Sequence, residues 1–322
     1  MSVDEPPRGI PEEELLRFAD SMRVPPTPTP CIAPQLRALG VELRQDPRDE
    51  IVAGSAIAAL SDTRPFSAVR LGDGEYNLVC YRRYPGTPRL DRRAALASVS
   101  LNEDRFNVDD DWLPVLRELQ LMAMAEADII GTIGIDDETG IADASAWLDR
   151  QLIRLRDGIR FRAGMLRGRK AALELAASGF FEGRVVASAH FYLGVILNLD
   201  RLLDVANRVL LITARTDIVP GIAGRTRVPV ECIAIGDTSE EWRTSGRTPA
   251  FLRKVEDGLP ADMGGTLALV GAGIWAGTYC SWVKRRNGVA IDLGSGFDLL
   301  AGEAIRGNHE RMSSEERQKY AL

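Results

Sequence analysis

Short apolar runs rich in valine and isoleucine alternate with longer amphipathic segments over most of the chain. This alternation predicts an α/β fold: a mainly parallel β-sheet with helices on both faces. The predicted strands are 66–71, 128–133, 184–188, 208–213, 228–235, 266–270 and 289–293. The predicted helices are 50–60, 112–126, 145–156, 166–177, 191–204, 249–257 and 274–286.

The pattern divides the chain into three parts. Residues 1–48 read as an N-terminal extension, in which a short helix follows Pro11 and a proline-rich linker occupies residues 25–30. The α/β domain is expected over residues 49–305. Residues 306–322 are expected to form a charged C-terminal tail.

Composition narrows the class of protein. Hydrophobic residues make up 45% of the 322 positions and charged residues 27%, as in soluble globular proteins. The net charge of −6 argues against a dedicated nucleic-acid binder, which would show a basic excess. Four scattered cysteines without a CxxC pair, and a start without an apolar leader, favour a cytoplasmic protein.

One uncharged stretch, residues 263–283, is long enough for a membrane-spanning helix. It contains five glycines and is only weakly apolar. A strand, a glycine turn and a helix explain the same residues better, so no transmembrane segment is expected.

The first candidate for chemistry follows the strand at 66–71, in the string Arg70-Leu71-Gly72-Asp73-Gly74-Glu75. A glycine turn lets two carboxylates at i and i+2 converge. Mg²⁺ or Mn²⁺ takes one or two such carboxylates together with phosphate oxygens, and an arginine binds phosphate through two parallel hydrogen bonds. The alternative is an ordinary Asp-Gly turn with two solvated acids.

A second candidate is the glycine turn at Gly271 and Gly273, between a strand and a helix. Glycines there let backbone amides approach a phosphate. The spacing differs from the dinucleotide-binding fingerprint, although Asp292 stands 19 residues after Gly273, where that fingerprint places an acid. The alternative is tight packing of helix on strand through small residues.

Two acids, Asp292 and Asp298, bracket the glycine turn after the last strand. Either could accept a proton from a hydroxyl nucleophile, and the alternative for Asp298 is a helix N-cap. Arg215, after the strand at 208–213, is a candidate phosphate ligand, with a surface ion pair to Asp217 as the alternative. His190 also follows a strand, whereas His309 lies in the expected tail.

The string FSAVRLGDGE at 66–75 resembles the opening strand and Asp-x-Glu motif of the GT-D-type glycosyltransferases. The block LALVGAGIWAGTYCSWVKRRNGVAIDLGSGFDLLAG resembles the closing segment of that family, and VLLITAR resembles one of its inner strands. The resemblance spans residues 60–303 and implies a Rossmann-like domain that transfers a sugar from a nucleotide-diphosphate donor.

The resemblance implies that Asp73 and Glu75 bind Mn²⁺ or Mg²⁺ and the donor, and that Asp298, with Asp292 second, is the base. Gly72, Arg70, Arg215, Gly271 and Gly273 complete the expected donor site. The expected partners are a nucleotide-sugar donor and a glycan or other hydroxyl acceptor, with a homo-oligomer left open.

Two other functions remain open from the residues alone. An NAD(P)-dependent oxidoreductase would use the turn at 271–277 and leave the Asp-Gly-Glu string unexplained. A non-catalytic module would bind a nucleotide sugar without turnover.

Overall fold

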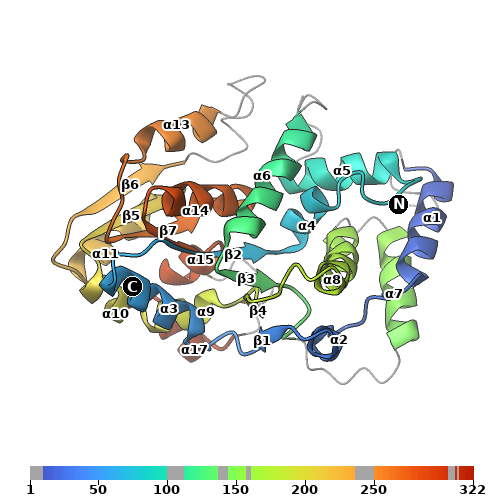
Figure 1. Ribbon diagram of the computed structural model, residues 1–322, viewed down its shortest axis with the longest axis horizontal. Helices are drawn as coiled ribbons and strands as arrows, with labels where there is room; N and C mark the ends of the chain where they lie inside the picture. Colours follow the sequence, from blue (N-terminus) through green and yellow to red (C-terminus); the bar gives the residue numbers. More distant parts are fainter. Residues whose placement is uncertain are drawn as a thin grey trace. The chain divides into compact units, whose positions relative to one another are not determined.

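The computed structural model of the chain describes residues 10–99, 112–136, 144–156, 161–235, 250–303, 309 and 312–322 (Figure 1). Eight strands form one all-parallel sheet in the order β1-β4-β3-β2-β8-β7-β5-β6, which confirms the predicted α/β class. The strands are β1 Glu42–Arg44, β2 Phe66–Leu71, β3 Ile129–Thr132, β4 Val185–Ser188, β5 Arg208–Thr213, β6 Val230–Ala234, β7 Thr266–Gly271 and β8 Val289–Asp292.

Each predicted helical segment overlaps at least one helix, and further helices lie outside these segments. Those of the first half are α1 Glu12–Arg23, α2 Ala33–Ala38, α3 Ile51–Ser61, α4 Asp73–Val79, α5 Pro88–Val99, α6 Trp112–Glu126, α7 Ala144–Arg156 and α8 Phe161–Ala177. Those of the second half are α9 Tyr192–Leu197, α10 Leu199–Val205, α11 Val219–Gly224, α13 Ala250–Gly258, α14 Ala276–Arg285, α15 Gly296–Leu300 and α17 Ser314–Gln318, with 3₁₀ turns η2 Thr216–Ile218 and η3 Gly273–Trp275.

The structure differs from the predicted pattern in a few places. Strand β1 and helices α2, α4, α5, α11 and α17 were not predicted as elements. The helix expected at 191–204 is divided at Asn198 into α9 and α10. The uncharged stretch at 263–283 forms β7, η3 and α14. None of the helices in the described part of the chain is long and apolar enough to cross a membrane.

The chain divides into two compact units whose boundaries differ from the expected domains. The first unit comprises residues 1–45, 71–121 and 131–189, and the second comprises 46–70, 122–130 and 190–322. The expected N-terminal extension is therefore divided: most of it belongs to the first unit, and residues 46–48 belong to the second. The described end of the expected C-terminal tail belongs to the second unit, while residues 306–308 and 310–311 lie outside the described residues.

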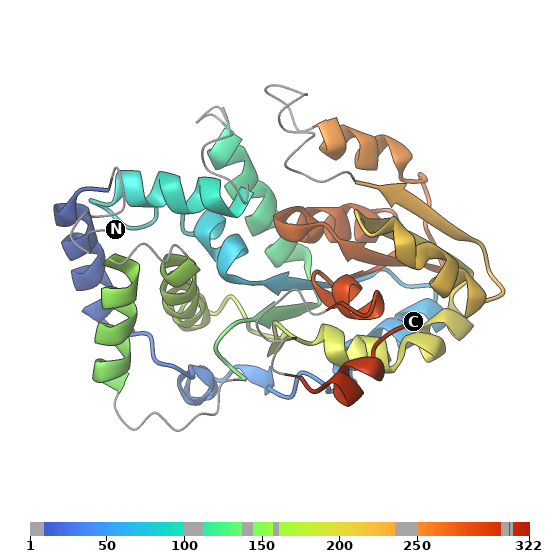
Figure 2. The same ribbon diagram turned by 180° about the vertical axis from the view of Figure 1, so that it is seen from behind.

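In the second unit, helices cover both faces of the strands. Helix α14 lies against β7 and β8 on one face, and α3, α9 and α10 lie on the other (Figures 1 and 2). The described part of the tail packs on this unit, because Tyr320 is buried and Arg48 donates to its hydroxyl and pairs with Glu316. These contacts replace the free charged tail that the sequence suggests.

In the first unit, the proline-rich segment is anchored by buried cations of α8. Proline has no amide hydrogen, and the carbonyls of such a segment need donors from elsewhere. The Lys170 ammonium donates to the Val24 and Pro26 carbonyls at 2.6 and 3.2 Å, and Arg169 Nε donates to Pro30. Burial lowers the pKa of Lys170. The segment is thus part of the packed unit rather than a linker.

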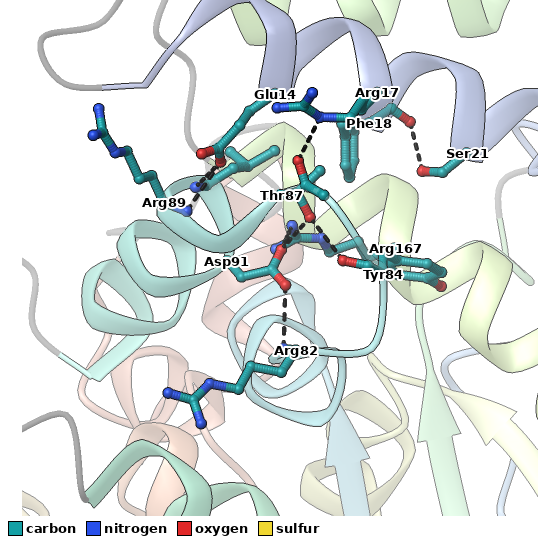
Figure 3. A network of polar contacts seen from close by, with 12 residues as sticks. Glu14, Arg17, Phe18, Ser21, Arg82, Tyr84, Thr87, Arg89, Asp91 and Arg167 are labelled. Atoms are coloured by element: carbon teal, nitrogen blue, oxygen red, sulfur yellow. Dashed lines mark hydrogen bonds and ion pairs between the residues drawn. The ribbon is translucent and has the colours of Figure 1, made fainter.

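A buried polar network joins α1, α5 and α8 of the same unit (Figure 3). The Glu14 carboxylate accepts hydrogen bonds from the Arg89 and Leu90 amides at 2.9 and 3.1 Å, which satisfies the first amides of α5. Arg167, fully buried against the ring of Phe18, pairs with Asp91. Burial raises the pKa of Asp91, outweighing the opposite effect of Arg167.

Removing Asp91 from the Arg167–Asp91 ion pair would leave the buried Arg167 guanidinium without its counter-charge. Asp91→Ala is therefore expected to lower the free energy of unfolding by about 3–5 kcal/mol. Asp62→Ala, which breaks the exposed pair with Arg64, is the matched control and should cost less than about 1 kcal/mol. Urea denaturation measures both, and equal losses would contradict the assigned burial of the pair.

Two glycines of α8, Gly164 and Gly168, let α4 approach closely. A Cβ at Gly164 would overlap the Asp73 carbonyl oxygen, and one at Gly168 would overlap the Tyr76 ring. The Tyr76 hydroxyl shares a hydrogen bond with Thr132 at 2.6 Å, and both residues are fully buried. The backbone of Asp73 therefore packs directly on α8, at the face that carries Gly164 and Gly168.

Gly164→Ala is expected to destabilise the protein by about 1–3 kcal/mol, because α4 or α8 must shift. Gly54→Ala is the matched control: no atom lies within 4 Å of a Cβ there, and alanine is the better helix former. We expect this control to be neutral or stabilising in the same urea titration. A neutral Gly164→Ala would rule out the close approach of α4 to α8.

Candidate active site

The strand order reverses at the pair β2–β8. From β2 the chain proceeds through β3 to β4 on one side, whereas β5 to β7 lie beyond β8 on the other. Strands β2 and β8 pair in parallel, with Phe66 opposite Val289 and Ala68 opposite Ile291. In parallel α/β sheets, ligands bind beyond the carboxyl ends of the strands where the order reverses. The topology therefore predicts a ligand site at the residues that follow Ala68 in β2 and Ile291 in β8.

Arg70 and Asp292 meet at this position, both in the second unit. The Arg70 amide donates to Asp292 Oδ2 at 3.2 Å, and the guanidinium Nη1 donates to the Leu293 carbonyl at 2.9 Å. Asp292 is only 3% exposed. Its carboxylate adds to the effect of burial in raising the pKa of the Cys280 thiol. Asp292 thus joins the ends of the two strands, while the Arg70 side chain is fixed at the edge.

The Asp-Gly-Glu string belongs to the first unit and starts a helix. Gly72 precedes α4, and its amide donates to Glu75 Oε2 at 2.8 Å. Asp73 and Glu75 occupy the first and third positions of α4, and side chains two residues apart in a helix project about 200° apart. The structure thus places the two half-buried carboxylates in one helical turn instead of the converging glycine turn that the sequence suggested.

Arg215, after β5, is surrounded by three carboxylates of the second unit. Its guanidinium makes two hydrogen bonds to Asp217, at 3.1 and 2.8 Å, and two to Glu303, at 2.6 and 2.9 Å. Asp298 lies 3.5 Å from Nη1. Hydrogen bonds from Arg215 lower the pKa values of Asp217 and Glu303. Arg215 thus makes four hydrogen bonds to carboxylates. The expected alternative, an ion pair with Asp217, is present, and Glu303 is a second partner.

The candidate bases have different surroundings. The side chain of Asp298 is 16% exposed and lies in the first turn of α15, after the cap residue Ser295, so it does not act as an N-cap. Asp292 is nearly inaccessible and accepts the Arg70 amide. Of the two, Asp298 is the better placed to accept a proton from a bound hydroxyl.

The glycine turn after β7 serves two purposes. A Cβ at Gly271 would overlap the ring of Phe297, so this glycine is required for packing. Gly273 has φ +53°, a conformation that side chains disfavour, and open space surrounds its Cβ position. Of these two glycines, only Gly273 has no atom of the described residues within 4 Å of its Cβ position.

Several residues that shape the site were missed in the sequence. Tyr192, Glu303 and His309 each contact a predicted site residue or a neighbour of one, and they come from segments with no recognisable motif. His309, expected in a charged tail, is fully buried and pairs with the Tyr192 hydroxyl.

The described residues contain no group of three or more His, Cys, Asp or Glu side chains arranged to hold a metal ion. Because Asp73 and Glu75 project to different sides of α4, an Mg²⁺ ion whose coordination is completed by phosphate oxygens would take one of these carboxylates rather than both. Comparison with known proteins finds no matching family model, no matching curated protein and no matching solved structure.

Replacing Arg215 by glutamine removes the cation that lowers the pKa values of Asp217 and Glu303. Carboxylates with lowered folded-state pKa values stabilise the protein above their unfolded values and lose that contribution as pH falls through the folded values. The stability difference between wild type and Arg215→Gln should therefore be largest at neutral pH. It should shrink below the ordinary values of 4.5 for Glu and 3.8 for Asp.

Urea titrations at pH 7, 5, 4 and 3 measure this difference. Arg225→Gln, which breaks the exposed pair with Asp200, is the control and should show little pH dependence. A difference for Arg215→Gln that stays constant with pH would contradict the ion-pair assignment.

Proposed function

We propose that the protein is a metal-dependent glycosyltransferase that moves a sugar from a nucleotide-diphosphate donor to a hydroxyl acceptor, in polysaccharide or glycan biosynthesis. The observation that carries the proposal is the Arg70 side chain, held beyond the carboxyl ends of β2 and β8 where the strand order reverses. A guanidinium is always charged and matches the geometry of phosphate oxygens. Arg70 would bind the donor diphosphate.

The sequence resemblance predicts Mn²⁺ or Mg²⁺ on Asp73 and Glu75. Because α4 turns these two side chains apart, the ion would be held through the Asp73 carboxylate, three residues after Arg70. When bound, such an ion neutralises the negative charge that develops on the leaving diphosphate. Glu75 accepts the Gly72 amide and fixes the start of α4, so it would position Asp73. Gly273 offers a backbone position with open space beside it for the rest of the donor.

Asp298 would accept the proton of the acceptor hydroxyl. Its neighbour Arg215 lies 3.5 Å from the carboxylate, and Glu303 and Asp217 hold Arg215 in place. In this arrangement Arg215 would position Asp298 and would not bind the donor phosphate itself, because its hydrogen bonds go to Asp217 and Glu303. The four cysteines are free, which suits the cytoplasmic setting that we propose.

A thermal-shift panel of UDP, GDP and NAD, each with and without Mn²⁺, tests the proposal. At a ligand concentration 100 times the dissociation constant, binding stabilises the folded protein by about 2.7 kcal/mol. We expect a Mn²⁺-dependent shift with one nucleoside diphosphate that is lost in Asp73→Asn/Glu75→Gln. Asp62→Asn/Asp149→Asn, at two exposed carboxylates, is the matched control and should keep the shift.

Asp298→Asn separates the enzyme from a binding module. It should keep the nucleotide shift, whereas transfer to the acceptor should fall by two orders of magnitude or more, the scale of general-base catalysis. A Mn²⁺-independent shift with NAD that survives in Asp73→Asn/Glu75→Gln would refute the transferase and favour an oxidoreductase.

A further inference from the structure

The side chain of Arg70 rests on a fully buried tyrosine of the second unit. Its guanidinium carbon lies 4.8 Å from the centroid of the Tyr192 ring, over the ring face. Tyr192 has no exposed surface, and its hydroxyl shares a hydrogen bond of 2.9 Å with His309 Nε2. His309 is itself fully buried. Three residues far apart in the sequence thus form a continuous stack that ends at the Arg70 guanidinium.

Two glycines make room for this stack. A Cβ at Gly294, which has φ +47°, would overlap Arg70 Nη1, and a Cβ at Gly296 would lie 3.0 Å from the Tyr192 ring. The Leu293 carbonyl accepts from the same Nη1 at 2.9 Å. The guanidinium is therefore held by a ring face and by a carbonyl, in a slot that larger residues at 294 and 296 would close.

We propose that Tyr192 and His309 are positioning residues for Arg70: the Tyr192 ring supports the guanidinium, and His309 fixes the ring through the phenol. The inference rests on the proposed function, because it takes Arg70 as the phosphate ligand. An arginine that is already fixed loses less side-chain entropy when a phosphate binds than a free one does. His309 makes the chain beyond α15 part of the donor site.

The first measurement needs no ligand. The chain has only two histidines, so ¹⁵N-histidine labelling gives two sets of imidazole signals, which His190→Gln assigns. Tyr192→Phe should move the His309 Nε2 signal by removing its partner, and Arg70→Gln should move it by releasing the ring. Arg215→Gln, also an arginine at a strand end but outside the stack, is the control and should leave it unchanged. An unmoved His309 signal in Arg70→Gln would overturn the coupling.

The second measurement is calorimetric titration with UDP, GDP and inorganic pyrophosphate in the presence of Mn²⁺. Loss of the cation–π contact in Tyr192→Leu should weaken binding about three- to thirtyfold. Tyr192→Phe keeps the ring and should restore most of the affinity. His309→Gln, whose amide can still pair with the phenol, should bind more tightly than His309→Ala. If Tyr192 and His309 were merely structural, all four variants would lose stability, but Tyr192→Phe would not bind more tightly than Tyr192→Leu, nor His309→Gln more tightly than His309→Ala.

The two proposals fail in different ways. If Arg70→Gln loses binding while Tyr192→Leu binds as the wild type does, the positioning role is overturned and the proposed function stands. If the wild type binds none of the three probes, the proposed function is refuted, and the histidine spectra alone decide the positioning role: a response of His309 to Arg70→Gln supports it, and no response overturns it.

Discussion

The hydrogen bond from the Arg70 amide to Asp292 joins the carboxyl ends of β2 and β8, and the candidate site depends on it. These two strands lie where the order of the parallel sheet reverses. A nearly inaccessible carboxylate costs free energy unless it is hydrogen-bonded, so Asp292 fixes the strand ends in one register. Because the backbone of Arg70 is held in this way, its side chain can leave the sheet at a defined point and rest on Tyr192 and the Leu293 carbonyl.

Close approach through glycine recurs at the positions that matter for the site. Gly164 admits the backbone of Asp73, Gly294 admits the Arg70 guanidinium, and Gly271 admits the ring of Phe297. In each case a Cβ would overlap an atom of the site or of a residue that packs against it: the Asp73 carbonyl oxygen, Arg70 Nη1 or the Phe297 ring. Glycine provides space at these three positions, and at Gly273 and Gly294 a positive φ also favours glycine.

Most of the fold could be predicted from the sequence. Buried parallel strands such as β5 and β7 are short continuous apolar runs bounded by polar residues, and they were predicted to within one or two residues. The short edge strand β1 has three residues, two of them exposed and none buried, so it carries no such signal. The proline-rich segment was predicted as a linker, since the buried cations that anchor it lie about 140 residues away in the sequence.

The candidate site was only partly predictable. Residues at strand ends, such as Arg70, Asp292 and Arg215, follow from topology, because the carboxyl ends of parallel strands share one edge. The direction of a side chain does not follow in this way: the start of α4 turns Asp73 and Glu75 apart, and Glu303 takes up two of the donors of Arg215. His309 could not be found either, since its burial depends on a contact with Tyr192, 117 residues earlier.

The most direct test of the account is a crystal structure with Mn²⁺ and the nucleoside diphosphate that stabilises the protein most. The account predicts a phosphate oxygen within hydrogen-bonding distance of the Arg70 guanidinium, with the guanidinium still on the face of Tyr192. A nucleotide bound away from Arg70, with Arg70 still on the Leu293 carbonyl and no phosphate beside it, would contradict the central claim.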